Sequence, residues 1–367
     1  MRNDAAASSG TLRRSRHLLL TYGFRPFFLF AGLIASLAML AWLLVWFGYA
    51  GVATPFSPVI WHGHEMLFGY GMAVIAGFLL TASPNWLGSK PFAGTGLLLL
   101  ALLWLLGRVA YWSAAALPLP LVAAVDLGFV VALGLVVAVP LVQAKARRQY
   151  PLIGVLAILL VANLMTYLEG FGLAVDPRNG LVLGVDVIVL LIGLMGGRII
   201  PSFTGNALRA AGNPAPLRAW PWLERLTLPT LALFVITDVV LPGSLLAALA
   251  AFAAAAVHGF RLSGWQTRQV LRQPILWVLH AGYAWLAVGL GLRGLADIAP
   301  VVPASAALHA LTAGAIGVMT LGVMSRVALG HTGRALVVAW PVVAAYGLVN
   351  LAALLRVFVP ILAPNWQ

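Results

Sequence analysis

The chain carries Trp61-His62-Gly63-His64-Glu65-Met66 at the start of an apolar run that continues to Ala82. After Glu65, the only ionisable side chain in that run belongs to Tyr70. A run of about 20 apolar residues can span a bilayer, so the stretch predicts a transmembrane helix that opens with two histidines and a carboxylate. Titratable groups inside lipid are costly and usually have partners and a function. We interpret the histidines as candidate ligands of a metal or a haem, and a hydrogen-bonded polar pair at the membrane interface is the alternative.

The composition is that of a polytopic membrane protein. The 367-residue chain is 62% hydrophobic and 8% charged, whereas soluble domains carry about 25% charged residues. It has no cysteine, which excludes disulfides, thiolate copper sites, iron–sulfur clusters and the Cys-x-x-Cys-His attachment of haem. Any metal would be held by His, Met, Tyr or carboxylate side chains. The net charge of +13 lies mostly in short loops between apolar segments, which indicates membrane topology rather than nucleic-acid binding.

Eleven apolar segments have about the length that a membrane-spanning helix needs. They cover residues 27–48, 59–82, 93–113, 118–142, 151–173, 181–202, 226–241, 244–262, 273–293, 304–326 and 335–359. We therefore predict an all-α polytopic membrane protein with eleven transmembrane helices. The helices are expected to form a single bundle over residues 27–367, preceded by a basic cytoplasmic tail over residues 1–26.

The basic residues divide the predicted loops into two alternating sets. One set is rich in arginine and lysine, and the loops between hold only Arg178, with Arg293 at one edge. The positive-inside rule places the basic loops and the N-terminus in the cytoplasm. His62 and His64 then lie at the external end of the second segment.

Acidic residues and histidines gather near the predicted external ends of several segments, within about two helical turns. This layer comprises the carboxylates Glu65, Asp126, Glu169, Asp186 and Asp238 and the histidines His62, His64 and His309. Because a lipid-facing position would be costly for each of them, we interpret the layer as functional. The alternative is an interior hydrogen-bonded network that fixes helix contacts.

Helical geometry limits how the paired histidines can act. His62 and His64 point about 200° apart if both are helical, so they cannot easily share one metal ion. His62 and Glu65 share a face, so Glu65 is expected to orient His62. His309 would then complete a ligand pair across the bundle. Alternatively, Gly63 loosens the first turn and lets both imidazoles converge.

A second group of polar residues lies toward the predicted cytoplasmic side. Arg198 near the end of the sixth segment, Arg326 at the end of the tenth and His331 in the loop that follows are candidates to bind an anion or haem propionates. Anchoring of the topology by positive charge is the alternative. His280 lies about two turns into the ninth segment. It is a candidate second haem ligand or a core histidine.

Four motifs occur in order along the chain. They are Tyr22-Gly23-Phe24-Arg25-Pro26-Phe27-Phe28, His62-Gly63-His64-Glu65-Met66, Gly197-Arg198-Ile199-Ile200-Pro201-Ser202-Phe203-Thr204-x-Asn206, and His309-Ala310-Leu311-Thr312 through Met324-Ser325-Arg326 to Gly330-His331-Thr332-Gly333-Arg334. Together they resemble the NnrS family, from residue 22 to the end. The resemblance implies a bacterial inner-membrane protein that contains haem and copper and is linked to nitric oxide and nitrosative stress. It also implies twelve helices, so the last helix is expected to be missing here.

The resemblance leads to two hypotheses on function. In the first, the protein is an oxidoreductase of nitric-oxide detoxification that couples two NO molecules to N2O, with a quinol or a cytochrome as electron donor. The metal ligands would be His62, His64 and His309, and Glu65 with Glu169 or Asp186 would relay protons. Arg25, Arg198 or Arg326 would neutralise the propionates of a b-type haem. In the second hypothesis, a transporter or an NO sensor uses the same histidine–carboxylate layer, and catalytic turnover discriminates between the two.

Overall fold

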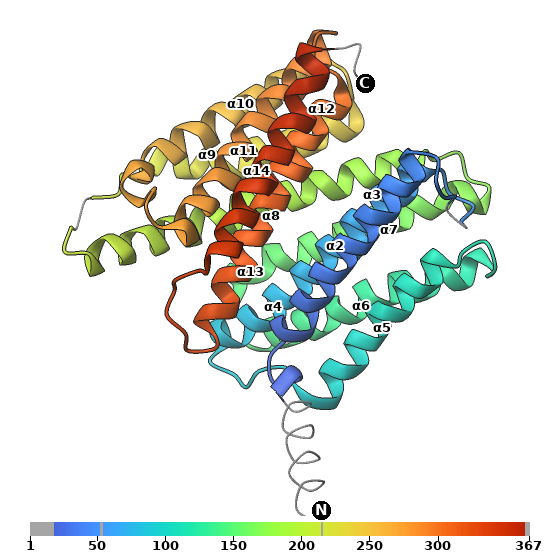
Figure 1. The fold of residues 1–367 in the computed structure, drawn as a ribbon, viewed down its shortest axis with the longest axis horizontal. Helices are drawn as coiled ribbons and strands as arrows, with labels where there is room; N and C mark the ends of the chain where they lie inside the picture. Colours follow the sequence, from blue (N-terminus) through green and yellow to red (C-terminus); the bar gives the residue numbers. More distant parts are fainter. Residues whose placement is uncertain (1–17, 52–53, 214–215, 364–367) are drawn as a thin grey trace, which may run out of the picture. The chain divides into compact units, whose positions relative to one another are not determined.

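The computed structural model describes residues 18–51, 54–213 and 216–363, and they form helices and connecting loops with no strand among them (Figure 1). The chain divides into two compact units, Met1–Gly184 and Val185–Gln367. Helix α8 (Pro177–Ala210) begins in the first unit and continues into the second. Most of the predicted cytoplasmic tail lies outside the described residues, and the single bundle over residues 27–367 stays a prediction.

The first unit is built around one long helix that contains the histidine motif. Helix α3, the π-helical turn η1 and α4 follow each other without a break over residues 58–87, and α2 packs against them. Helix α5 packs on α6, and α6 packs on α7. The elements are α2 (Phe24–Trp46), α3 (Pro58–His64), η1 (Glu65–Gly71), α4 (Met72–Leu87), α5 (Gly94–Trp112), α6 (Leu119–Gln143), η2 (Arg147–Gln149), α7 (Tyr150–Leu168) and η3 (Glu169–Phe171).

The second unit is centred on α11. This helix packs against α10 and against the continuous helix α12–η5–α13, while α9 packs on α10 and α14 on η5 and α12. The elements after α8 are α9 (Pro221–Val240), α10 (Leu245–Ser263), η4 (Thr267–Val270), α11 (Pro274–Ile298), α12 (Ala304–His309), η5 (Ala310–Gly317), α13 (Val318–Gly330) and α14 (Trp340–Leu362).

The predicted apolar segments correspond to the long helices. Each of the eleven overlaps one of them, and ten of the described helices are long and apolar enough to cross a membrane. Helix α9 is outside this set because Glu224, Arg225 and Asp238 interrupt its apolar sequence. The fold class is therefore that of an all-α, multi-pass membrane protein. The number of crossings and the cytoplasmic N-terminus stay predictions.

The side chains of α2 and α14 agree with a lipid-facing position. Only 17% of the most apolar stretch of each helix is buried inside the protein. Leu33, Leu37 and Leu40 on α2 and Leu348 on α14 are among the exposed side chains. An apolar exterior of this kind is stable in hydrocarbon, where the backbone polar groups are already paired within the helix.

Two π-helical turns each begin directly after a histidine of the predicted layer. η1 follows His64, and η5 follows His309. π-helical turns are rare and often mark functional sites, because their wider turn changes the directions of the side chains around them. The two predicted ligand positions therefore lie where the helix geometry departs from regular α-helix.

Candidate functional site

The start of α3 sets the directions of the two paired histidines. The Ser57 hydroxyl caps this helix by accepting from the backbone N–H of Ile60 at 3.4 Å, and Pro58 occupies its first turn. His62 stacks on Trp42 of α2, with ring centroids 4.4 Å apart. His64 points instead toward α5 and α7 (Phe68 aside, its ring neighbours are tyrosines of those helices). The predicted separation of the imidazoles is confirmed, and they do not converge.

Arg108 on α5 joins two buried carboxylates. Its Nη1 donates to Oε1 of Glu65 at 2.6 Å, and its Nη2 donates to Oδ1 of Asp126. The indole N–H of Trp112 donates to the other oxygen of Glu65 at 2.8 Å. A Cβ at Gly69 would lie 3.1 Å from Oε2 of Glu65, so glycine in the π-helical turn leaves room for the close approach. The guanidinium thus compensates charges from η1 and α6.

His64 hydrogen-bonds to the far side of the same group. Its Nε2 lies 3.0 Å from Oδ1 of Asn163 and 3.2 Å from Oδ2 of Asp126. Asn163 and Tyr167 also donate to Oδ2 of Asp126, at 2.8 and 2.9 Å. Since both neighbours of Nε2 are acceptor oxygens, this nitrogen carries the proton, and Nδ1 faces Oε1 of Glu65 at 3.6 Å. We call these residues the Arg108 network: His64, Glu65, Arg108, Asp126, Asn163 and Tyr167.

The Arg108 network is buried from solvent, and it has one positive charge fewer than it has negative charges. His64 and Glu65 are 0% exposed, and Arg108 is 5% exposed. Two carboxylates and one guanidinium leave a net charge of −1 when the imidazole is neutral and of zero when it is protonated. Protonation of His64 at Nδ1, beside Glu65, would remove this imbalance, and a buried unbalanced charge is costly.

The partner predicted for Glu65 is wrong, and Arg108 was not among the predicted site residues. Glu65 does not orient His62; it contacts Arg108 and Trp112. The physical reason is that a buried carboxylate needs a compensating charge, and Arg108 is the only charged residue in α5. That isolated cation in an apolar helix was the available signal. Asn163 and Tyr167 gave no comparable signal, because amides and phenols also occur at ordinary helix contacts.

The other predicted carboxylates do not join this network. Glu169 is exposed in η3 at the end of α7. Asp186 is buried in the second unit, where its polar neighbours are Asp238 and Arg293. The carboxylates of the predicted layer therefore form one cluster in each unit, and Glu169 belongs to neither. The proton-relay roles of Glu169 and Asp186 stay predictions.

His309 has the hydrogen bond of a metal-binding histidine. It is the last residue of α12, and its Nδ1 lies 2.6 Å from the backbone carbonyl of Ser305. A carbonyl can only accept, so Nδ1 carries the proton and Nε2 presents its lone pair. Among the described residues, Nε2 of His309 has no hydrogen-bond partner. Metal-binding histidines are commonly oriented in this way by a backbone carbonyl.

His280 has the contacts of a core histidine. Its Nε2 lies 2.9 Å from the hydroxyl of Thr204, and its Nδ1 lies 2.9 Å from that of Thr267. The side chain is buried, so both nitrogens are used within the protein. Of the two interpretations of this histidine, the hydrogen bonds favour the core position.

The predicted anion-binding residues belong to different elements, α2, α8, α13 and the loop after α13. Arg25 donates to the backbone carbonyl of Leu18 at 2.9 Å. The guanidinium of Arg326 lies 3.7 Å from the centre of the Phe203 ring. Arg198 is exposed on α8, and His331 follows α13, where partial burial lowers its pKa. Arg326 is thus held against a residue of another predicted motif.

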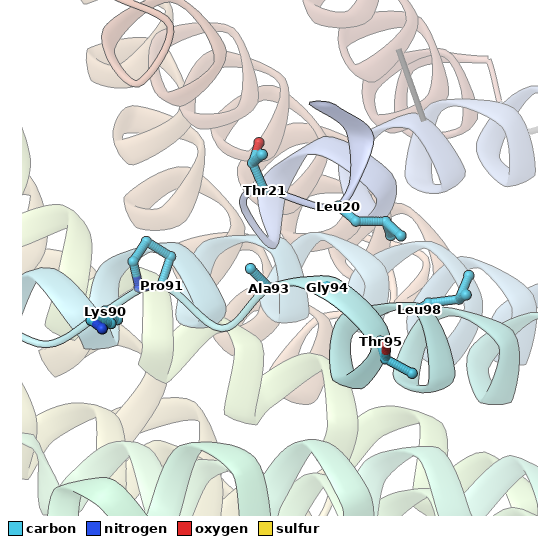
Figure 2. A pocket seen from close by; sticks show the side chains of 8 residues that line it. All are labelled: Leu20, Thr21, Lys90, Pro91, Ala93, Gly94, Thr95 and Leu98. Atoms are coloured by element: carbon cyan, nitrogen blue, oxygen red, sulfur yellow. The ribbon is translucent and has the colours of Figure 1, made fainter. Parts of the chain in front are cut away.

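The predicted ligands do not form a ready metal cage in the described part of the chain. Among the described residues, no three His, Cys, Asp or Glu side chains are placed so that they could hold a metal ion together. Figure 2 shows an open pocket where the chain enters α2 and α5. It is lined by Leu20, Thr21, Lys90, Pro91, Ala93, Gly94, Thr95 and Leu98. No member of the Arg108 network lines this pocket.

Comparison with known protein families gives a match for this chain. The family model described as NnrS protein matches residues 18–367, which is nearly the whole chain. The chain belongs to the NnrS family. No curated protein and no solved structure matches it. Membership in the NnrS family and ten potential membrane-spanning helices together identify a multi-pass membrane protein of this family.

Proposed function

We propose that this NnrS-family protein is a haem-binding enzyme of nitric-oxide detoxification in the bacterial inner membrane. It would reduce two NO molecules with two electrons and two protons to N2O and water. The electrons would come from a quinol or a cytochrome. The observation that carries the proposal is the buried Arg108 network, which is one positive charge short of neutrality and therefore suited to hold a proton for this reaction.

His309 is the histidine best suited to bind haem iron. Its Nδ1–H donates to the carbonyl of Ser305, which directs the lone pair of Nε2 away from its own helix turn. His62 is a second candidate, partly exposed at the start of a helix and stacked on Trp42. A haem iron would supply the position that binds NO and the route by which electrons reach it.

His64 does not fit a haem in its present contacts. Its Nε2 faces two acceptor oxygens, and Tyr111 stacks on the ring with a centroid distance of 3.8 Å. We therefore assign His64 to proton handling, and its role as a metal ligand stays a prediction. Copper also stays a prediction.

The Arg108 network would act as a general acid and a proton reservoir. Protonation of His64 at Nδ1 makes the network neutral and places the new N–H beside Oε1 of Glu65. Glu65 and Asp126 stay ionised because Arg108 is bound to both. Release of that proton would return the network to its net negative state, ready for the next proton.

The haem propionates would need cationic partners. Arg326 is the strongest candidate, because its guanidinium is partly buried and lies over an aromatic ring with no carboxylate bound to it among the described residues. Arg25, Arg198 and His331 keep the same predicted role. The arginine side chains can form two parallel hydrogen bonds to a propionate, whereas the histidine can form only one.

An optical spectrum of the purified, reduced protein with and without NO tests the proposal. We expect a haem absorption band that shifts with NO, and N2O formation when a quinol is supplied. The His309→Ala variant should lose or alter the band, whereas His64→Gln should retain it. Well-folded, haem-supplied protein with a featureless spectrum would overturn the proposal. NO binding without N2O formation would favour a sensor, and proton-coupled transport without N2O would favour a transporter.

A further inference from the structure

The second unit contains a buried acidic cluster that none of the roles above requires. Asp186 lies on α8, Asp238 on α9, and Arg293 and Asp297 on α11. Both Nε and Nη2 of Arg293 bind the same oxygen, Oδ1 of Asp238, at 2.9 and 2.8 Å. Nη1 of Arg293 lies 3.8 Å from Oδ1 of Asp297. One guanidinium thus contacts two of the three carboxyl groups.

Three carboxyl oxygens in this cluster lack a partner. Oδ2 of Asp186, of Asp238 and of Asp297 has no hydrogen-bond partner among the described residues. Asp186 is 1% exposed and Asp238 is 2% exposed, so water does not cover them. A carboxylate accepts hydrogen bonds and cannot donate, so unpartnered buried oxygens of this kind call for a hydrogen or a cation.

The side chains of Asp186 and Asp238 are within hydrogen-bonding reach of each other. Two ionised carboxylates repel at this distance and cannot hydrogen-bond, whereas a carboxylic acid donates well to a carboxylate. Arg293 binds Asp238 directly and reaches Asp186 only through its charge, so Asp238 is the better anion of the two. Asp186 is then the group that carries the hydrogen.

Counting the charges leads to the same assignment. With all three carboxyl groups ionised, the cluster would hold a net charge of −2 inside a helical membrane protein, which is costly. One hydrogen shared between Asp186 and Asp238 halves that charge and satisfies one of the unpartnered oxygens. The four residues named are the titratable groups that the structure places at this pair.

We propose that Asp186 and Asp238 form a carboxyl pair that binds one exchangeable proton, a second proton-binding site separate from the Arg108 network. Asp297 lies in the last turn of α11 and faces the other side of Arg293, across 3.8 Å from Nη1. The proposal needs neither haem nor NO, so it stands or falls independently of the function proposed above.

Infrared spectroscopy of the full-length protein in lipid at neutral pH tests the pair directly. We expect a carboxylic-acid C=O band that moves to lower frequency in D2O, and that moves again in wild-type protein labelled with carbon-13 at the aspartate carboxyl. Asp186→Asn should remove the intensity of one carboxyl group. Asp176→Asn is the matched control, because Asp176 is exposed and caps the backbone N–H of Arg178.

The variants are expected to differ in stability as well. Asn at position 186 can donate its amide N–H to Asp238, so Asp186→Asn should fold like the wild type. Asp238→Asn removes the anion that binds Arg293 and should lower the unfolding temperature. A wild-type spectrum without an aspartic-acid band, or a band unchanged in Asp186→Asn, would overturn the proposal. An absent band together with stabilisation by sodium ions would show instead that a cation occupies the pair.

Discussion

Arg108 of α5 donates to Glu65 across 2.6 Å, at the first residue of the π-helical turn η1. The same guanidinium also pairs with Asp126 of α6, so a single cation connects three elements of the first unit. In an apolar interior each of these charges would be costly alone, and their stability depends on one another. Because of this dependence, we expect the replacement of Arg108 to lower the stability of the protein the most.

Replacing Arg108 by leucine should therefore destabilise the protein severely. The change leaves two buried carboxylates without a counter-charge, and breaking a buried ion pair costs about 3–5 kcal/mol. Arg108→Lys should cost less, because the charge is kept while one of the two hydrogen bonds is lost. Thermal unfolding in detergent, followed by far-UV circular dichroism, measures the difference.

Arg178→Ala is the control for that experiment, since Arg178 is exposed at the start of α8. The Arg178→Ala variant should have the same unfolding temperature as the wild type. If Arg108→Leu also unfolded at the wild-type temperature, Glu65 and Asp126 would have to be neutral without the guanidinium, and the charge balance described for the network would be wrong.

A second prediction concerns Gly197 on α8. A Cβ at this position would clash with Nη1 of Arg261, which donates to the carbonyl of Gly193 at 3.1 Å. Nη2 of the same guanidinium pairs with Glu224. Gly197→Ala should push the guanidinium out of these contacts. Overpacking typically costs about 1–3 kcal/mol, and loss of the ion pair adds to it.

Gly128→Ala on α6 is the matched variant, because a Cβ there meets no atom within 4 Å. It should stabilise its helix by about 0.5–1 kcal/mol, the usual difference between glycine and alanine. Both variants replace a glycine within a helix, but only Gly197→Ala displaces Arg261. The difference between their stabilities therefore measures the effect of that displacement. Equal stabilisation by both changes would contradict the packing described for Gly197.

The sequence was sufficient to place the helices, because their signal is local. Apolar length predicts each segment, and the cap at Ser57 and Pro58 explains where α3 begins. Helix α8 shows the limit of this signal. It continues to Ala210, beyond the predicted end at residue 202, because polar residues that leave the apolar core can remain helical.

The candidate site was harder to predict, because helical periodicity predicts the face of the helix on which a residue lies and not the residue that it contacts on another helix. Regular helix geometry correctly separated His62 from His64. It also put Glu65 with His62, but the partner of Glu65 is a cation on α5 that no local pattern connects with it. The π-helical turns after His64 and His309 add to the difficulty, since they change side-chain directions and have no simple sequence signature.

Histidine variants should separate structural from ligand positions. His280→Gln should keep the haem band, because both nitrogens of His280 are occupied by threonine hydroxyls. It should lower stability by about 1–3 kcal/mol by leaving a buried polar group unpaired. His309→Gln should have the opposite pattern, with wild-type folding and a lost or altered band. A band lost only in His280→Gln would show that the ligand assignment is reversed.

Glu65→Gln tests the proton role of the Arg108 network. With one carboxylate removed, Arg108 and Asp126 balance each other, so the network is neutral without a proton and His64 has no reason to take one up. The glutamine carbonyl still accepts from Arg108, but the amide NH2 cannot accept from Trp112, and the loss of that hydrogen bond costs about 1–3 kcal/mol. The protein should therefore fold and keep its haem band.

Its rate of NO consumption should fall by about 10²-fold or more, the usual contribution of a positioned general acid. The remaining rate should also slow further in D2O than that of the wild type, because proton delivery then limits turnover. Asp176→Asn, which changes an exposed acid, should keep both the rate and the solvent isotope effect. A wild-type rate in Glu65→Gln, with the band intact, would mean that the protons reach the substrate by another route and that the network serves only to join η1, α5 and α6.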